Sequence, residues 1–133
     1  MTVRRWAGLG AVVAASLSAA CKSTEPLVKC KSGVVLTVHA GATPRFDWSP
    51  ACLAFRVDVE DSAGATIWSV RAAGGDSIAP GVVYGDLPHG AALQPVPPVA
   101  LQHGKQYGVF VFRYIGPTDN DVDNIAAKLF VQP

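Results

Sequence analysis

The sequence predicts an all-β protein, a single antiparallel β-sandwich that follows an N-terminal signal segment. From Ser32 onward, short apolar-alternating stretches are separated by turn residues, a spacing typical of a β-sandwich or barrel. Outside the signal segment, no stretch shows the long 3.6-residue apolar period of a helix. The chain has 133 residues, enough for one domain after the signal. We therefore expect a signal peptide at 1–20, a tether at 21–31 and a sandwich at 32–133.

The first segment has the physical plan of an export signal. Arg4 and Arg5 form a short positive region, and residues 6–17 that follow carry no charge. The uncharged stretch is too short for a transmembrane helix, which needs roughly 20 apolar residues. The small side chains at 18–20 then suit the narrow subsites of a signal peptidase.

The residues that close this segment, Leu17-Ser18-Ala19-Ala20-Cys21, resemble the lipobox of bacterial lipoproteins, although Ser18 stands where the family usually has Leu. The resemblance implies that Cys21 begins the mature protein, carries diacylglycerol on its sulfur and is acylated at its amine, with palmitate as the expected chain. An ordinary cleaved signal is the alternative, because small residues also suit the general signal peptidase. Lys22 after the cysteine favours, by the same resemblance, the outer membrane, facing the periplasm or the surface.

The chain has three cysteines, and an odd number in an exported protein needs an explanation. Lipidation of Cys21 would leave Cys30 and Cys52 as a pair in an oxidising compartment. A bridge between them would close a loop of about 22 residues and stabilise the fold by roughly 3 kcal/mol. A metal site would need more ligands, and the three histidines lie at no recognisable zinc spacing.

The first half of the domain contains four expected strands. Residues 34–39 and 44–48 alternate apolar and polar side chains, and Phe46 and Trp48 share a face of the second strand. Residues 53–60 show the clearest alternation, which predicts one buried face and one wet face carrying Asp58. A turn at 61–64 then returns the chain as the hairpin partner at 65–70.

The second half is less regular. After a loop at 72–75 we expect an irregular stretch with a short strand near 82–84. Four prolines in 88–99 exclude a central strand there. The run Pro95-Val96-Pro97-Pro98 has two interpretations: a polyproline II segment that binds a partner, or a stiff crossing between sheets.

Two strands are expected near the C-terminus. Residues 106–115 are apolar on both faces, which predicts a central strand or a covered edge. Residues 124–131 form the last expected strand, with Ile125, Ala127, Leu129 and Val131 on one side.

The stretch Leu101 to Val111 resembles the Leu-x-x-Gly-x-x-Tyr-x-Val-x-Val signature of fibronectin type III domains. The resemblance implies a tyrosine corner, in which the Tyr107 hydroxyl bonds to nearby backbone. Phe46-x-Trp48 is similar to the strand-B tryptophan of the same family. The family implies a fold and no particular function.

The net charge and the absence of common catalytic motifs argue against several classes of function. Loss of Arg4 and Arg5 leaves nine basic and ten acidic residues, so the mature chain has no basic excess for nucleic acid. No nucleophile elbow, P-loop, dinucleotide fingerprint or His-Glu-x-x-His motif occurs, and no cofactor is expected. Asp119, Asp121 and Asp123 resemble the start of a calcium loop, but Asn124 and Phe130 stand where its glycine and glutamate belong. The other interpretation is a solvated loop before the last strand.

We therefore expect a lipoprotein of the cell envelope that is a non-enzymatic binding or structural module. Its expected partners are the membrane, through the lipid anchor, and an envelope protein. Two alternatives stay open: an accessory or hydrolytic domain acting on envelope glycans, and a subunit of an envelope complex. The first needs a pocket with acidic or histidine side chains of perturbed pKa, and the second an exposed face at Phe110, Phe112 and Tyr114.

Overall fold

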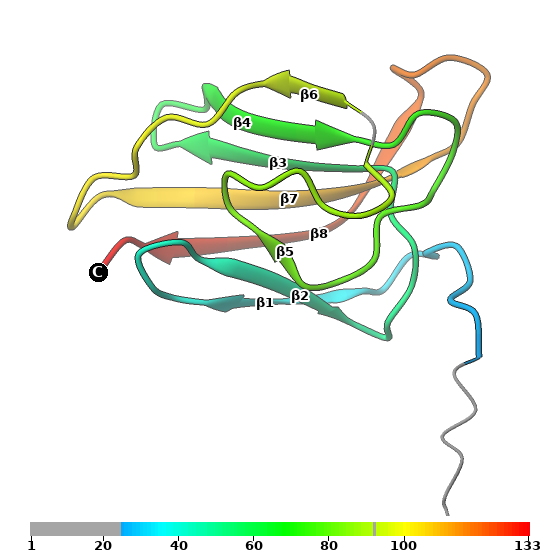
Figure 1. Cartoon of the computed structure of the whole chain (residues 1–133), viewed down its shortest axis with the longest axis horizontal. Coiled ribbons are helices and arrows are strands. Elements are labelled where there is room, and N and C mark those ends of the chain that lie inside the picture. The colour runs from blue at the N-terminus through cyan, green and yellow to red at the C-terminus, as the bar shows by residue number, and fades with distance from the viewer. Residues whose placement is uncertain (1–24, 92) are drawn as a thin grey trace, which may run out of the picture.

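The computed structural model describes residues 25–91 and 93–133, which form two antiparallel β-sheets packed face to face (Figure 1). The smaller sheet has the order β1-β2-β5, and the larger sheet has the order β6-β4-β3-β7-β8. The predicted all-β sandwich is thus confirmed. The strands of the described residues are β1 (Val35–His39), β2 (Arg45–Ser49), β3 (Arg56–Asp61), β4 (Thr66–Arg71), β5 (Val82–Val83), β6 (Leu93–Val96), β7 (Gln106–Tyr114) and β8 (Val122–Val131).

The first four strands lie where the apolar alternation predicts them. β1 pairs with β2, and β3 pairs with β4 through the predicted turn. In that turn the Asp61 carboxylate accepts hydrogen bonds from the backbone N–H groups of Ala63 and Ala65, both at 3.0 Å. Gly64 has a φ of 83°, which is a conformation that glycine adopts without steric cost. The local sequence therefore determines this hairpin.

The irregular middle of the chain supplies one edge strand to each sheet. β5 pairs with β2 in the smaller sheet, whereas β6 pairs with β4 and ends the larger one. β6 contains Pro95, which has no N–H to donate and is tolerated at a sheet edge. The prediction that this proline-rich stretch is no central strand is confirmed.

β7 lies between β3 and β8, so the prediction of a central strand is confirmed. Its inward residues Tyr107, Val109 and Val111 are buried. Its outward aromatic residues Phe110, Phe112 and Tyr114 are half-buried, and Tyr114 packs its ring 5.2 Å from that of Phe55. The inner face of the strand is therefore buried and its outer face is partly shielded from solvent.

The predicted facing of the last strand is wrong beyond its first residues. Ile125 is buried, but Leu129 and Val131 are 64% and 56% exposed. The buried side chains of the later part are instead Ala126 and Phe130. The side chains that alternation places on one face with Ile125 therefore point to solvent in the later part of β8.

A β-bulge causes this change of face. Val111 of β7 pairs with Ala126, whereas the next residue, Phe112, pairs with Asn124, so Ile125 is the extra residue. Successive side chains of a strand point to opposite faces, so one extra residue reverses the facing of those that follow.

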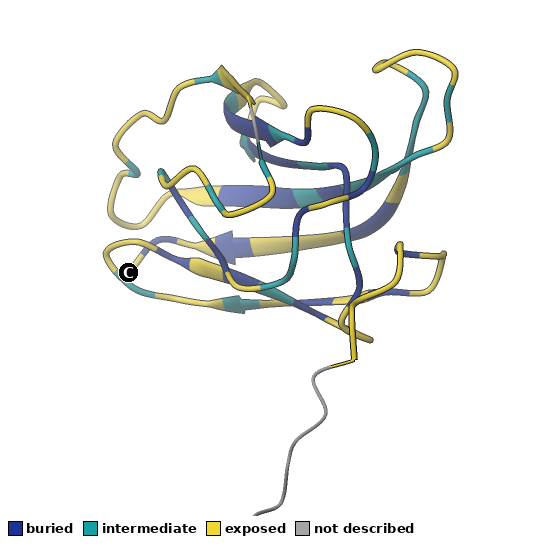
Figure 2. Ribbon diagram, turned by 45° about the vertical axis from the view of Figure 1, so that its right-hand side comes forward, coloured by how far each residue is buried: buried dark blue, intermediate teal, exposed yellow. Residues whose placement is uncertain are grey.

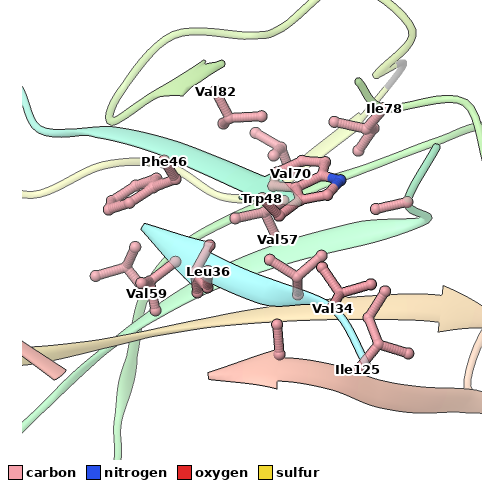
Figure 3. Packing of buried hydrophobic residues seen from close by; sticks show 14 of the residues in the cluster. Val34, Leu36, Phe46, Trp48, Val57, Val59, Val70, Ile78, Val82 and Ile125 are labelled. Atoms are coloured by element: carbon pink, nitrogen blue, oxygen red, sulfur yellow. The ribbon is translucent and has the colours of Figure 1, made fainter. Parts of the chain in front are cut away.

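One apolar core fills the space between the sheets (Figures 2 and 3). Phe46 of β2 is fully buried in it, and its ring centroid lies 6.5 Å from that of Trp68 and 5.8 Å from that of Phe130. The fully buried side chains come from both sheets and from the connections, and the largest include Trp68, Phe46, Phe55, Ile78, Val57, Val59, Val70, Val82, Val109 and Val111.

The sandwich has two ends that differ in what they carry. At the end that we call the near end, Val28–Cys30 meets Leu53, and the first described residues lie there on the right of Figure 1. At the far end lie the β3–β4 turn, the start of β7 and the C-terminus. β8 alone has ten residues, so the two ends are about 30 Å apart.

Candidate functional site

The near end joins the N-terminal segment to the sandwich. The Leu53 N–H donates to the Val28 carbonyl and the Cys30 N–H donates to the Leu53 carbonyl, both at 2.8 Å. Cys30 and Cys52 form a disulfide, which confirms the predicted pairing. The indole N–H of Trp48 donates to the Cys52 carbonyl at 2.8 Å. Among the residues described from Glu25 onward, backbone bonds to the sandwich therefore start at Val28, within the segment 21–31 that we expected to act as a tether.

A hollow of about 220 Å³ lies beside this junction, and it combines apolar and cationic side chains. Lys29 and Lys31 are exposed at its border, and Val28 is 70% exposed. Cys21, the predicted lipid attachment site, lies outside the described residues. The hollow is lined by Val28, Lys29, Lys31, Ser32, Val34, Pro50, Ala51 and Cys52.

The far end carries two adjoining open grooves of about 270 and 330 Å³. Asp61, Ser62, Gln106 and Tyr107 line both of them, so the grooves flank one ridge. This ridge joins the β3–β4 turn to the start of β7, which pair at Asp61 and Tyr107. Two turns and a strand therefore build the grooved surface from backbone that the sheet holds in place.

The second groove has an apolar floor and an acidic border. Gly108 lies between Glu60 of β3 and Leu129 of β8 and leaves room there because it has no side chain. A Cβ at Gly108 would come 3.0 Å from the Phe110 ring. The groove therefore combines an aromatic ring, a leucine and two carboxylates on one surface. No histidine or cysteine lines either groove.

Tyr107 also anchors the chain before β7. Its hydroxyl accepts a hydrogen bond from the Gln102 N–H at 2.9 Å, which is the type of contact that the family resemblance implies. Tyr84 lies across the sandwich from it and donates its hydroxyl to the Val99 carbonyl at 2.6 Å. Burial raises the pKa of Tyr84. The two tyrosines thus fix the crossing segment 99–102 between the sheets.

A buried carboxyl lies in the middle of the larger sheet, which the alternation did not predict. Asp58 of β3 is only 6% exposed, although we expected it on a wet face. The Ser69 hydroxyl donates to it at 2.6 Å, and Arg56 Nε lies 3.0 Å from its other oxygen. Burial raises the pKa of Asp58, while Ser69 and Arg56 partly offset that rise. Asp58 lines neither far-end groove.

Covering by neighbouring side chains explains why Asp58 is buried. The Arg56 guanidinium lies 4.3 Å from the centre of the Phe112 ring, a cation–π contact that holds the arginine flat on the sheet. Phe110 is directly opposite Asp58 on β7. Large side chains on the outer face thus exclude water from a carboxyl whose sequence position suggests exposure.

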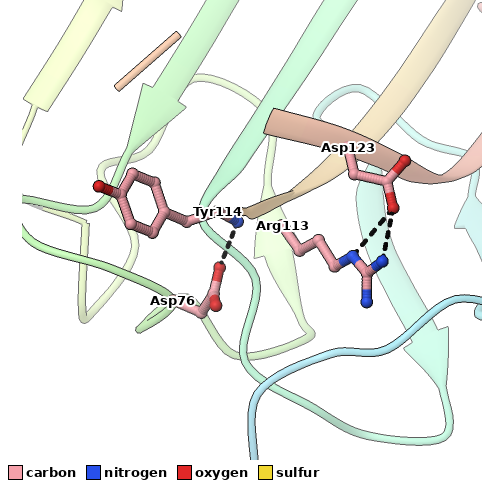
Figure 4. A network of polar contacts seen from close by, with 4 residues as sticks. All are labelled: Asp76, Arg113, Tyr114 and Asp123. Carbon is pink, nitrogen blue, oxygen red and sulfur yellow. Dashed lines mark hydrogen bonds and ion pairs between the residues drawn. The ribbon is translucent and has the colours of Figure 1, made fainter. Parts of the chain in front are cut away.

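The three aspartates of the candidate calcium loop interact with different partners. Asp121 accepts from the Thr118 N–H and hydroxyl, and these bonds lower its pKa. Asp123 pairs with Arg113, whose Nε and terminal nitrogen both lie 2.9 Å from one carboxylate oxygen (Figure 4). Within residues 25–91 and 93–133, no three acidic, histidine or cysteine side chains gather as a metal site. Asp119 lies 3.5 Å from Arg71.

Asp76 is a second buried carboxyl that sequence analysis did not single out. It is 9% exposed and accepts a hydrogen bond from the Tyr114 N–H at 2.7 Å, at the end of β7 (Figure 4). It comes from the loop at 72–78, far from Tyr114 in the chain, so no local pattern could have indicated the contact. Its role is to satisfy a strand-end backbone donor.

Comparison with protein-family models, with curated proteins and with solved structures gave no match. Among the described residues, no helix has the length and apolar character to span a membrane.

Proposed function

We propose that this protein is a lipid-anchored β-sandwich of the bacterial cell envelope that acts as a non-enzymatic binding or structural module. The observation that carries the proposal is the pairing of Cys30 with Cys52, which uses two of the three cysteines. Cys21 then has no intramolecular partner, and it follows directly on an uncharged, export-type segment. Lipidation gives this third cysteine a role.

The sandwich itself is proposed to be fibronectin type III-like. Two features support this: the Tyr107 hydroxyl bond to backbone just before β7, and the buried Trp48 on β2. The Cys30–Cys52 bridge and the proline-containing edge strand β6 are additions to that family's plan.

The arrangement of the ends supports a binding role. The proposed anchor joins the near end, so the grooved far end is the part of the domain held away from the lipid. Its grooves are open and mixed in chemistry, which suits a protein surface better than an enclosed small molecule. The proposed placement is the outer membrane, on the periplasmic or the outer side.

Metabolic labelling with a palmitate analogue in the native host tests the anchor. We expect label and membrane fractionation for the wild-type protein, and loss of both for Cys21→Ala. The double variant Cys30→Ala/Cys52→Ala is the matched control, because it removes two cysteines and should keep the label. Labelling that survives in Cys21→Ala, or wild-type protein without label, would contradict the proposal.

A further inference from the structure

We propose that the near end of the sandwich docks directly on anionic lipid headgroups, so that the domain stands on the membrane with its far end outward. This inference rests on the proposed anchor at Cys21. It adds a second, non-covalent membrane contact, made by Leu27, Val28, Lys29 and Lys31, which we call the docking surface.

The number of residues between Cys21 and Val28 keeps this surface close to the membrane. Hydrogen bonds with Leu53 and the disulfide fix Val28 and Cys30 to the sandwich. Only six residues lie between Cys21 and Val28, so the two residues are at most about 25 Å apart when the chain is fully extended. The anchor therefore keeps the near end within about 25 Å of the lipid surface. This distance is shorter than the roughly 30 Å between the two ends of the domain.

The side chains at this end suit a headgroup layer. Leu27 and Val28 are 39% and 70% exposed, so apolar surface faces outward beside the junction. Lys29 and Lys31 are exposed on either side of the buried Cys30 and carry positive charge. Apolar side chains flanked by lysines are the composition that binds an anionic interface.

The acidic groups nearby already have other partners or are few. The Lys29 ammonium lies close to Gly75, and the next residue, Asp76, is buried and accepts a hydrogen bond from the Tyr114 N–H. Glu25 is the one acidic residue in the stretch 25–34, which also contains both lysines. At the end of β7, Asp119 and Asp123 already face Arg71 and Arg113. Asp121 accepts two hydrogen bonds within its own loop. The charge of the docking surface is therefore complementary to anionic lipid.

The expected gain is modest, which fits an orienting contact. A lysine at an anionic membrane surface favours the bound state by roughly fivefold. Two such residues favour the docked orientation by roughly 25-fold over a freely tumbling one, once the anchor supplies the local concentration.

The test uses the lipoprotein purified from its native envelope and placed in nanodiscs that contain a headgroup-chelated gadolinium lipid. Paramagnetic broadening of backbone amide signals reports the distance of each residue from the headgroups. In anionic discs we expect strong broadening at Lys31 and Ala51 and little at Ser62 and Gly104. The Lys29→Gln/Lys31→Gln variant, and wild-type protein in zwitterionic discs, should lose most of this contrast.

The matched control is Lys105→Gln/Lys128→Gln, which removes the same charge from exposed positions outside the docking surface. It should keep the wild-type pattern. Equal patterns for the two double variants would overturn the docking proposal. Mass spectrometry of the same sample separates the two proposals: an unmodified Cys21 contradicts the anchor alone, and coupling of a maleimide lipid to its thiol then allows the docking measurement.

Discussion

At the scale of single residues, Asp58 shows how an exposed-looking position acquires a buried charge. Its place in an alternating strand indicates solvent, and the backbone does direct it to the outer face. Arg56, Phe110 and Phe112 then cover it, and burial raises its pKa. Alternation determines which face a side chain takes, but long side chains on neighbouring strands decide whether that face is wet.

The raised pKa predicts a specific pH dependence of stability. The folded state holds the Asp58 proton more tightly than the unfolded state, whose reference pKa is 3.8. The stabilising contribution is complete below that pH and is lost as pH rises through the folded pKa. Chemical denaturation across this range should therefore show the difference in unfolding free energy, wild type minus Asp58→Asn, falling with rising pH. A difference that rises, or that does not vary, would contradict the assignment.

Asp121 provides a control of opposite sign. Hydrogen bonds from Thr118 lower its pKa, so its contribution is present above 3.8 and lost as pH falls through the folded pKa. The corresponding difference for Asp121→Asn should rise with pH. A common sign for both variants would point to a general effect of charge removal.

At the scale of elements, most strands follow from the sequence because their alternation and turn residues are local signals. The bulge in β8 does not follow from local signals, because it depends on how β8 pairs with β7 on either side of Ile125. The sheet membership of β5 and β6 also depends on long-range pairing, with β2 and β4 respectively. No composition within 72–100 could have indicated which sheet each strand joins.

The bulge has a direct energetic consequence along β8. Phe130 packs 5.8 Å from both the Phe46 and Tyr107 rings, so Phe130→Ala should lower the unfolding free energy by about 3 to 4 kcal/mol. Leu129→Ala, at a 64% exposed position, should cost less than about 0.5 kcal/mol. Denaturant titration checks both. A larger loss for Leu129→Ala would restore the facing that simple alternation predicts.

The segment 99–102 offers a test of the tyrosine contacts. Tyr107→Phe leaves the Gln102 N–H without its acceptor and should cost about 1 to 2 kcal/mol. Hydrogen exchange at the Gln102 amide should accelerate in this variant. Tyr84→Phe is the control: it removes the hydrogen bond to the Val99 carbonyl but leaves the Tyr107 hydroxyl as the acceptor of the Gln102 N–H. If Gln102 exchanged at the wild-type rate in Tyr107→Phe, the hydroxyl would not be its partner.

The disulfide connects the element scale to the whole molecule. It closes a loop with a sequence separation of 22, so Cys30→Ala/Cys52→Ala should lower the unfolding free energy by about 3 kcal/mol. Amide exchange should increase first at Cys30 and Leu53, whose backbone bonds lie beside the bridge. Unchanged stability in a denaturant titration would show that the near end holds without it.

At the scale of the whole molecule, the two ends of the sandwich differ in what they carry, and the sequence did not indicate this difference. The sequence predicted the sandwich from local alternation and the pairing of Cys30 with Cys52 from counting, whereas the contact of Tyr107 was expected only from the family resemblance. It did not predict that, within residues 25–133, backbone bonds to the sandwich start at Val28, or that two adjoining grooves lie at the opposite end. Those properties depend on which turns the sheet brings together.

The central claim is that Cys21 carries a lipid, which holds the near end of this domain at a membrane. Mass spectrometry of the N-terminal peptide, from protein isolated from its native envelope, tests it most directly. The account predicts a peptide that begins at Cys21 and carries a diacylglyceryl group on sulfur and an acyl chain on the amine. A peptide with an unmodified Cys21, whether the signal is cleaved or retained, would contradict it.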